Sequence, residues 1–168
     1  MNSQISSHRR PALGALLMVL SASAVLAQSN NNVPFKGAFD ARDTGVVQFP
    51  ILLINGSGAG TASLLGRFTF TYTTKVDLTN ATSSGVIQLV AANGDVIHGV
   101  SVGRGEPTDT PNVTHVIQLV TITGGTGRFQ GATGGFTSDA LLVDDPNTGI
   151  GLSSGSLKGT ISTPESTK

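Results

Sequence analysis

Two histidines, His98 and His115, have the widest chemical range of the side chains that follow residue 27. An imidazole titrates near neutral pH, so a histidine inside a pocket can act as a general base. In regular strands each histidine would share a face with apolar residues, because alternate side chains point the same way. Such a face can equally hold a packed histidine with one hydrogen bond. Neither histidine has a carboxylate at ligand spacing, which argues against a zinc site.

An aromatic row alternates along residues 67–74. Phe68, Phe70 and Tyr72 fall on one face, and threonines fall on the other. This pattern is typical of a strand with one buried face. In a small barrel the row would line the interior, either as packed core or as the contact surface of one small ligand. The candidate ligand-binding residues are therefore Phe68, Phe70, Tyr72, His98 and His115.

The remaining motifs predict no metal site and no cofactor, and they identify no catalytic residue. The Gly-Gly-Thr-Gly segment at 124–127 is followed by a strand-like segment, whereas a phosphate loop leads into a helix, so a structural turn is favoured. The adjacent Asp144 and Asp145 would point in opposite directions along an extended segment, which argues against paired-carboxylate catalysis. No Gly-x-Ser-x-Gly motif lies between a strand and a helix.

The composition limits the classes of function. A length of 168 residues suggests one domain. The formal net charge of +0 argues against nucleic acid as a partner, because phosphate binding needs clustered Lys and Arg. The chain has no cysteine, which excludes disulfides and thiolate chemistry. The fold must therefore depend on backbone pairing and packing.

The N-terminal segment has the three parts of a secretory signal. Arg9 and Arg10 precede an apolar run, and small residues lead to a cleavage point after Ala27. The apolar run is shorter than the roughly 20 residues of a membrane span, and no later segment is long and apolar enough. The prediction is a secreted or periplasmic protein without a transmembrane segment after cleavage. Its parts are a signal peptide at 1–27, a polar leader at 28–32, one domain at 33–162 and a tail at 163–168.

Strand patterns dominate the domain. Asn93-Gly94 between two apolar runs is a strong hairpin signal. Without a crossover helix the sheet must be mostly antiparallel, which leaves a sandwich or a barrel. Val-Ile-Gln-Leu-Val occurs at 86–90 and at 116–120, which we interpret as shared strand composition. The predicted strands are 33–39, 46–54, 67–74, 86–91, 96–102, 115–123, 136–143 and 156–161, and the predicted loops include 56–60 and 103–111.

Three segments together resemble a known family. They are Gly-Ala-Gly-Thr-Ala-Ser-Leu-Leu-Gly-Arg-Phe-Thr at 58–69, Ala-Ala-Asn-Gly-Asp at 91–95, and Ile-Thr-Gly-Gly-Thr-Gly-Arg-Phe-Gln-Gly-Ala-Thr-Gly at 122–134. The chain resembles bacterial proteins with an allene oxide cyclase barrel-like domain, and the third segment also resembles plant dirigent proteins. The resemblance implies an eight-stranded antiparallel β-barrel of the calycin or lipocalin-like sort. It transfers no catalytic residue to a position of this sequence.

The function expected from these features is non-enzymatic binding of a small apolar ligand or of a protein partner by an exported barrel. The alternative implied by the resemblance is an isomerase or cyclase, or a dirigent-like protein that steers a bound substrate. Such a protein needs few catalytic groups, so a sequence without a catalytic motif is compatible with it. A structural subunit that assembles as a homo-oligomer is a third hypothesis.

Overall fold

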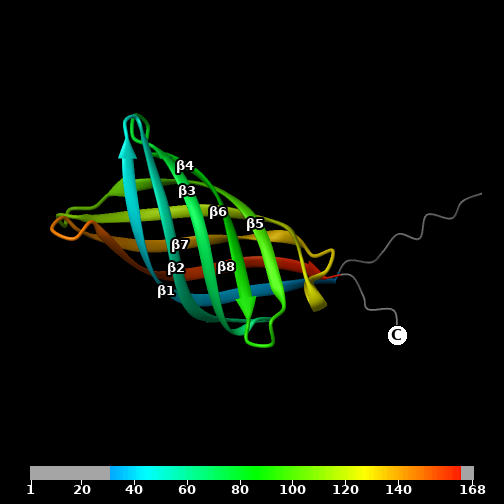
Figure 1. Ribbon diagram of the computed structural model, residues 1–168. Helices are drawn as coiled ribbons and strands as arrows, with labels where there is room; N and C mark the ends of the chain where they lie inside the picture. Colours follow the sequence, from blue (N-terminus) through cyan, green and yellow to red (C-terminus); the bar gives the residue numbers. More distant parts are fainter. Residues whose placement is uncertain (1–30, 164–168) are drawn as a thin grey trace, which may run out of the picture.

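The computed structural model describes residues 31–163, which form one closed antiparallel sheet (Figure 1). Each strand pairs with its neighbours in sequence, and β1 also pairs with β8, from Asn31 opposite Thr163 to Thr44 opposite Ile150. The prediction of an all-β, eight-stranded antiparallel barrel is confirmed. The strands are β1 (Asn31–Gln48), β2 (Ile51–Ala62), β3 (Gly66–Asp77), β4 (Thr82–Ala91), β5 (Val96–Pro107), β6 (Val113–Gly125), β7 (Thr133–Asp145) and β8 (Ile150–Thr163).

The predicted signal peptide at 1–27 lies outside the described residues, as do residues 164–168. The predicted leader at 28–32 ends in Asn31 and Asn32, which are the first residues of β1. The predicted tail begins with Thr163, which is the last residue of β8. Within the described range, no helix has the length and apolar character needed to cross a membrane.

The strands are longer than the sequence patterns predicted. The predicted strand 46–54 is divided by the Phe49-Pro50 turn between β1 and β2. The predicted loop 56–60 lies inside β2, and the predicted loop 103–111 is reduced to 108–112 because β5 continues to Pro107. Both segments that were wrongly predicted as loops contain glycines. The packing around β2 explains why this strand needs glycine.

Glycines on the inner face of β2 make room for the aromatic row of β3. The register opposes Gly56 to Tyr72, Gly58 to Phe70 and Gly60 to Phe68. A Cβ atom added at Gly58 would lie 2.6 Å from the Phe70 ring, so each ring covers the backbone of its glycine partner. Cross-strand aromatic rings of this kind compensate for the missing side chain of a strand glycine. Glycine is therefore needed on the inner face of β2 because the rings of β3 occupy the space of a side chain.

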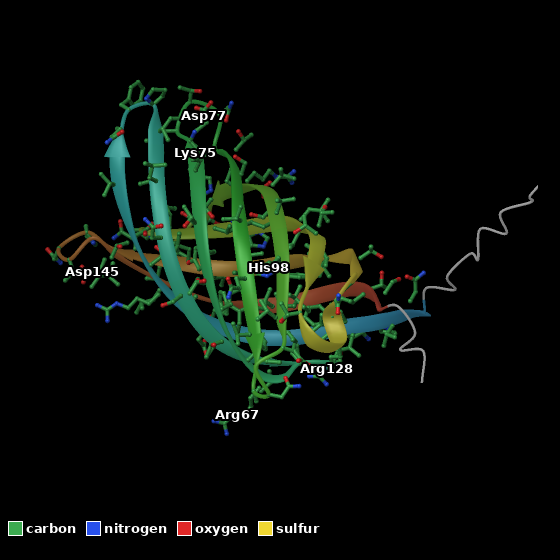
Figure 2. All side chains as sticks on the ribbon, turned by 45° about the vertical axis from the view of Figure 1, so that its right-hand side comes forward. Arg67, Lys75, Asp77, His98, Arg128 and Asp145 are labelled. Carbon is green, nitrogen blue, oxygen red and sulfur yellow. The ribbon has the colours of Figure 1, made fainter. Side chains whose placement is uncertain are left out.

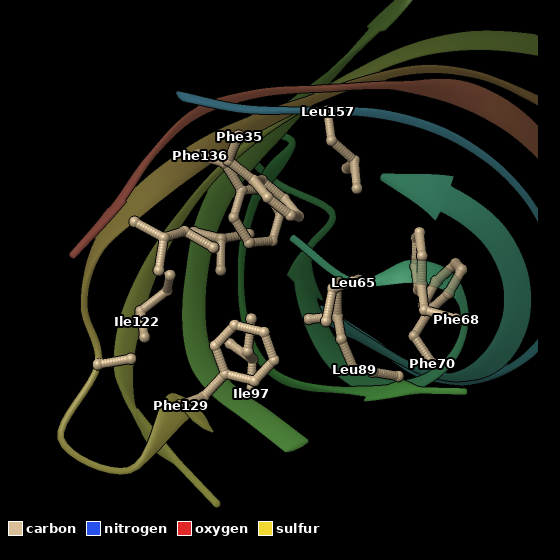
Figure 3. Packing of buried hydrophobic residues seen from close by; sticks show 14 of the residues in the cluster. Phe35, Leu65, Phe68, Phe70, Leu89, Ile97, Ile122, Phe129, Phe136 and Leu157 are labelled. Carbon is tan, nitrogen blue, oxygen red and sulfur yellow. The ribbon is translucent and has the colours of Figure 1, made fainter. Parts of the chain in front are cut away.

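One end of the barrel is closed by a dense apolar core (Figure 3). The rings of Phe35 and Phe136 lie 5.1 Å apart between their centroids, and both side chains are fully buried. Ile97 and Ile161 are also inaccessible to solvent. Both ends of the described chain, the β2–β3 and β4–β5 turns and the β6–β7 connection lie at this end.

The β6–β7 connection completes the closure through the short 3₁₀ helix η1 (Gly127–Phe129). The Thr126 amide donates to the Val96 carbonyl over 2.8 Å, which ties the connection to β5. Gly127 has a φ of +58°, a left-handed conformation that favours glycine. This geometry directs Phe129 into the core. The Gly-Gly-Thr-Gly segment thus forms a structural turn.

Candidate functional site

A cavity of about 360 Å³ lies in the half of the barrel opposite the closed end. The β1–β2, β3–β4, β5–β6 and β7–β8 connections surround its mouth, towards the upper left of Figure 1. The volume falls in the lower part of the roughly 300–1,000 Å³ range of small-molecule sites. Its apolar lining includes Phe39, Leu52, Ile54, Phe70, Ile87, Val116 and Leu142.

Small inward side chains in the middle of β7 and β8 leave room for the cavity. From the closed end to the middle of the barrel, the inward positions are Phe136, Ser138 and Ala140 along β7, followed by Leu142 at the mouth, and Leu157, Gly155 and Ser153 along β8. Large side chains fill the barrel at the closed end, whereas serine, alanine and glycine leave space above them. Gly155 is opposite Ala140, so two small residues of neighbouring strands lie at the same height of the barrel.

The polar centre of the cavity is a hydrogen bond between Tyr72 and Asp43. The Tyr72 hydroxyl donates to Asp43 Oδ2 over 2.6 Å and also contacts the Ser153 hydroxyl. Asp43 is only 9% exposed, and Tyr72 is half-buried. Asp144 stands nearer the mouth on β7 and also lines the cavity. A small ligand would therefore meet an apolar wall with two acidic side chains, Asp43 inside the cavity and Asp144 nearer the mouth.

Burial determines the titration of this pair. It raises the pKa of Asp43 above the ordinary aspartate value, the Tyr72 hydrogen bond partly offsets that rise, and the charge of Asp144 adds to it. Burial also raises the pKa of Tyr72, and the neighbouring Asp43 carboxylate raises it further. Tyr72 therefore remains a neutral hydrogen-bond donor, and Asp43 is the group that changes charge.

Sequence reasoning missed Asp43 because the first strand was predicted to end at residue 39. In the structure β1 continues to Gln48, and Asp43 is an inward residue within it. The alternation of residues along β1 did contain a signal for Asp43. Phe35, Phe39, Ala41 and Asp43 occupy positions of one parity, so a longer strand would have placed Asp43 on the face of the phenylalanines.

The predicted aromatic row divides between the cavity and the closed end. Phe70 and Tyr72 line the cavity. Phe68 also points inward, but it belongs to the buried core, 5.8 Å from Phe70 between ring centroids. The row therefore connects the packed half of the barrel to the open half.

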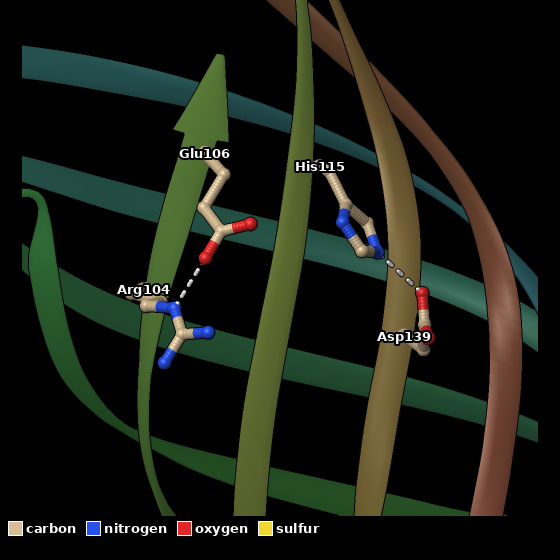
Figure 4. Close-up of polar contacts among 4 residues, drawn as sticks. All are labelled: Arg104, Glu106, His115 and Asp139. Atoms are coloured by element: carbon tan, nitrogen blue, oxygen red, sulfur yellow. Dashed lines mark hydrogen bonds and ion pairs between the residues drawn. The ribbon is translucent and has the colours of Figure 1, made fainter. Parts of the chain in front are cut away.

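The two predicted histidines lie outside the cavity, which corrects their assignment as cavity residues. His98 is exposed on the outer face of β5. His115 lies on the outer face of β6, where its Nε2 is 2.8 Å from Asp139 Oδ1 (Figure 4). The apolar residues that share their faces are directed outward with them, so an apolar face did not identify the interior.

Replacing Asp43 with asparagine is expected to raise the melting temperature by a few degrees near neutral pH. A raised pKa means that the folded state binds the Asp43 proton more tightly than the unfolded chain. The associated stability is complete below the ordinary aspartate pKa and is lost as the pH rises through the folded-state pKa. Asparagine does not titrate, so its advantage should disappear by about pH 4. Thermal unfolding followed by circular dichroism across this pH range measures the difference.

Asp40→Asn provides the matched control on the same strand, because Asp40 is exposed on the outer face. Its melting temperature should follow that of the wild-type protein at each pH. A lower melting temperature of Asp43→Asn near neutral pH would contradict the assignment of Asp43 as a buried carboxylate that costs stability.

Comparison with known proteins found no match among family models, curated proteins or solved structures. The resemblance to the allene oxide cyclase barrel-like proteins therefore stays a prediction. The cavity and the side chains that line it are the features of the molecule that point to a function.

Proposed function

We propose that this protein is an exported barrel that binds one small, mostly apolar molecule in its open cavity, without chemical change. The observation that carries the proposal is the asymmetry of the barrel interior. A dense phenylalanine core occupies one end, and a cavity of about 360 Å³ opens at the other. Such a cup is the arrangement expected of a calycin-like or lipocalin-like barrel, and this finer description of the fold is part of the proposal. The signal-like segment at 1–27 supports export to the periplasm or the exterior.

Apolar area provides the driving force for this binding. A compact ligand placed against Phe70 and Ile87 would lose contact with water over most of its surface, and burial contributes about 25 cal/mol per Å². Asp43 and Tyr72 add a polar group that orients the ligand. Apolar walls with a few convergent polar groups are the usual composition of a small-molecule site.

Replacing Ala140 with phenylalanine is expected to weaken ligand binding by about tenfold or more. Ala140 lines the cavity and is opposite Gly155, so an added ring would occupy the space of the ligand. The measurement is a fluorescence titration with the uncharged dye N-phenylnaphthylamine, whose emission increases in an apolar environment.

Leu141→Phe is the matched control, because Leu141 is the next residue of β7 and is half-exposed on the outer face. It should bind the dye like the wild-type protein. Ser138→Leu fills the same cavity with a smaller side chain and serves if Ala140→Phe does not fold. Folded cavity-filling variants that bind the dye as tightly as the wild-type protein would refute the proposal.

The second candidate function is an isomerase or cyclase, and the Asp43–Tyr72 pair favours it. A buried carboxylate with a raised pKa is a suitable base, and a neutral tyrosine hydroxyl is a suitable proton donor. Both groups contact the same apolar space, where a substrate would be held away from water. Recovery of the natural ligand chemically unchanged after incubation with the protein would leave only the binding role.

A further inference from the structure

The accessible charges of the cavity all have one sign. Asp43, Asp144 and Arg104 are its lining residues that carry formal charge. The Arg104 guanidinium, however, is directed to the outer surface, where its Nε lies 2.6 Å from Glu106 Oε1 (Figure 4). Its side chain is 64% exposed. A molecule inside the cavity therefore meets two carboxylates and no available cation among the described residues.

Asp43 has no counter-ion within residues 31–163. The ion pairs in this part of the chain join Arg104 to Glu106, His115 to Asp139 and Arg128 to Asp95, and none involves Asp43 or Asp144. A carboxylate that is 9% exposed loses most of its hydration, and its side-chain partner Tyr72 is a neutral donor. A positive charge brought in by a ligand would compensate for this loss.

The mouth of the cavity is also acidic. Asp77 ends β3, Asp109 lies in the β5–β6 loop and Asp145 ends β7, so three of the four surrounding connections carry a carboxylate. Hydrogen bonds from the Thr79 hydroxyl and from the Asn147 amide lower the pKa of Asp77 and of Asp145 respectively, which keeps both ionised.

The basic side chains near the mouth are directed away from the cavity interior. Lys75 and Arg42 occupy outward positions of β3 and β1, and Arg104 is paired with Glu106. Figure 2 shows Asp77 and Asp145 on opposite sides of the mouth, with Lys75 near Asp77 and with Arg67 and Arg128 at the other end of the barrel. A cleft lined by one sign of charge raises the local concentration of oppositely charged ligands.

We propose that the ligand is an apolar amine, whose ammonium group lies beside Asp43 and whose hydrophobic body packs against the aromatic and aliphatic cavity wall. The inference rests on the proposed function, because it names the chemical class that the same cavity takes. The Asp43 carboxylate is the counter-ion, and Asp144 attracts the cation at the mouth. A fatty acid or another carboxylate ligand would instead bring a third negative charge towards these two.

Three compounds with the same phenylpropyl body test the charge preference: phenylpropylamine, phenylpropanol and phenylpropanoate. Each competes with N-phenylnaphthylamine for the wild-type protein near neutral pH, where an alkyl ammonium is fully charged. The amine should displace the dye at a concentration about tenfold lower than the alcohol, because a hydrogen bond between charged groups is stronger than a neutral one. The carboxylate should be the weakest competitor, and added salt should reduce the advantage of the amine.

Asp43→Asn should remove the preference for the amine over the alcohol, while Asp40→Asn on the outer face of the same strand should preserve it. Asp144→Asn should reduce the preference, which provides a second variant if Asp43→Asn is not folded. Equal displacement by amine and alcohol, or stronger displacement by the carboxylate, would overturn the amine assignment and leave the binding role intact. Equal dye binding by the wild-type protein and by folded Ala140→Phe would overturn both the amine assignment and the proposed binding function.

Discussion

Gly58→Val is expected to lower the free energy of unfolding by about 3 kcal/mol or more, the upper range for overpacking a core. A Cβ atom at Gly58 would lie 2.6 Å from the Phe70 ring and would collide with the Asp40 carbonyl oxygen of β1. The ring is buried and the carbonyl belongs to the backbone, so neither can move without disturbing a neighbouring strand. Urea denaturation followed by circular dichroism gives the free energy.

Ala59→Val tests the same strand on the opposite face. Ala59 is exposed, and valine suits a strand, so its free energy of unfolding should stay within about 0.5 kcal/mol of the wild-type value. If Gly58→Val proved as stable as Ala59→Val, the inward direction of Gly58 and the register of β2 with β3 would both be incorrect.

Phe129→Ala is expected to lower the free energy of unfolding by about 3–5 kcal/mol, the usual cost of removing a buried phenylalanine ring. Phe129 is 1% exposed and fills the closed end from η1, where no other side chain of the connection can replace its ring. Most domains have only about 5–15 kcal/mol of stability, so a large part would be lost. The difference is measured by urea denaturation at low temperature.

Gln130→Ala is the control for the connection itself, because Gln130 follows Phe129 and is exposed. It should change the free energy of unfolding by no more than about 0.5 kcal/mol. Since the cavity lies at the opposite end, Phe129→Ala protein that remains folded should still bind N-phenylnaphthylamine. Wild-type stability of Phe129→Ala would mean that η1 does not close the barrel.

Short-range patterns were sufficient to predict the class of fold. The alternation of Phe68, Phe70 and Tyr72 identified the inner face of β3, and Asn93-Gly94 identified the β4–β5 turn. These signals depend on neighbours within a few residues, so tertiary structure does not alter them. The lengths of the strands depend on distant partners, so local patterns predicted them poorly.

The inner face of β5 could not be predicted from hydrophobicity. Its inward residues include Gly99 and Ser101, whereas Val100 and Val102 point outward and are 45% and 58% exposed. The interior at this height is already occupied by side chains of other strands, since a Cβ atom at Gly99 would lie 2.8 Å from Val120. Around Gly99 and Ser101 the small residues of β5 therefore point inward and the valines point outward. His98 shares its face with these valines, so its apolar face wrongly indicated a pocket position.

The candidate site also depended on long-range pairing. Asp43 and Tyr72 are far apart in sequence, and their hydrogen bond requires that β1 and β3 flank β2 in a fixed register. Neither residue belongs to a motif of recognisable spacing. The cavity itself results from differences in size between inward residues of β7 and β8, which no single segment reveals.

Closure of the sheet has a consequence for solubility. The two Val-Ile-Gln-Leu-Val segments combine high β propensity with no charge, which is the composition of segments that assemble into amyloid. In the closed barrel, residues 86–90 pair with β3 and β5, and residues 116–120 pair with β5 and β7. Both segments are therefore paired with a neighbouring strand on each side. Separation of β1 from β8 would free one edge of each of these two strands, while both Val-Ile-Gln-Leu-Val segments would remain paired with their neighbours. The β1–β8 seam thus leaves the closed sheet without a free edge to which a strand of another chain could add.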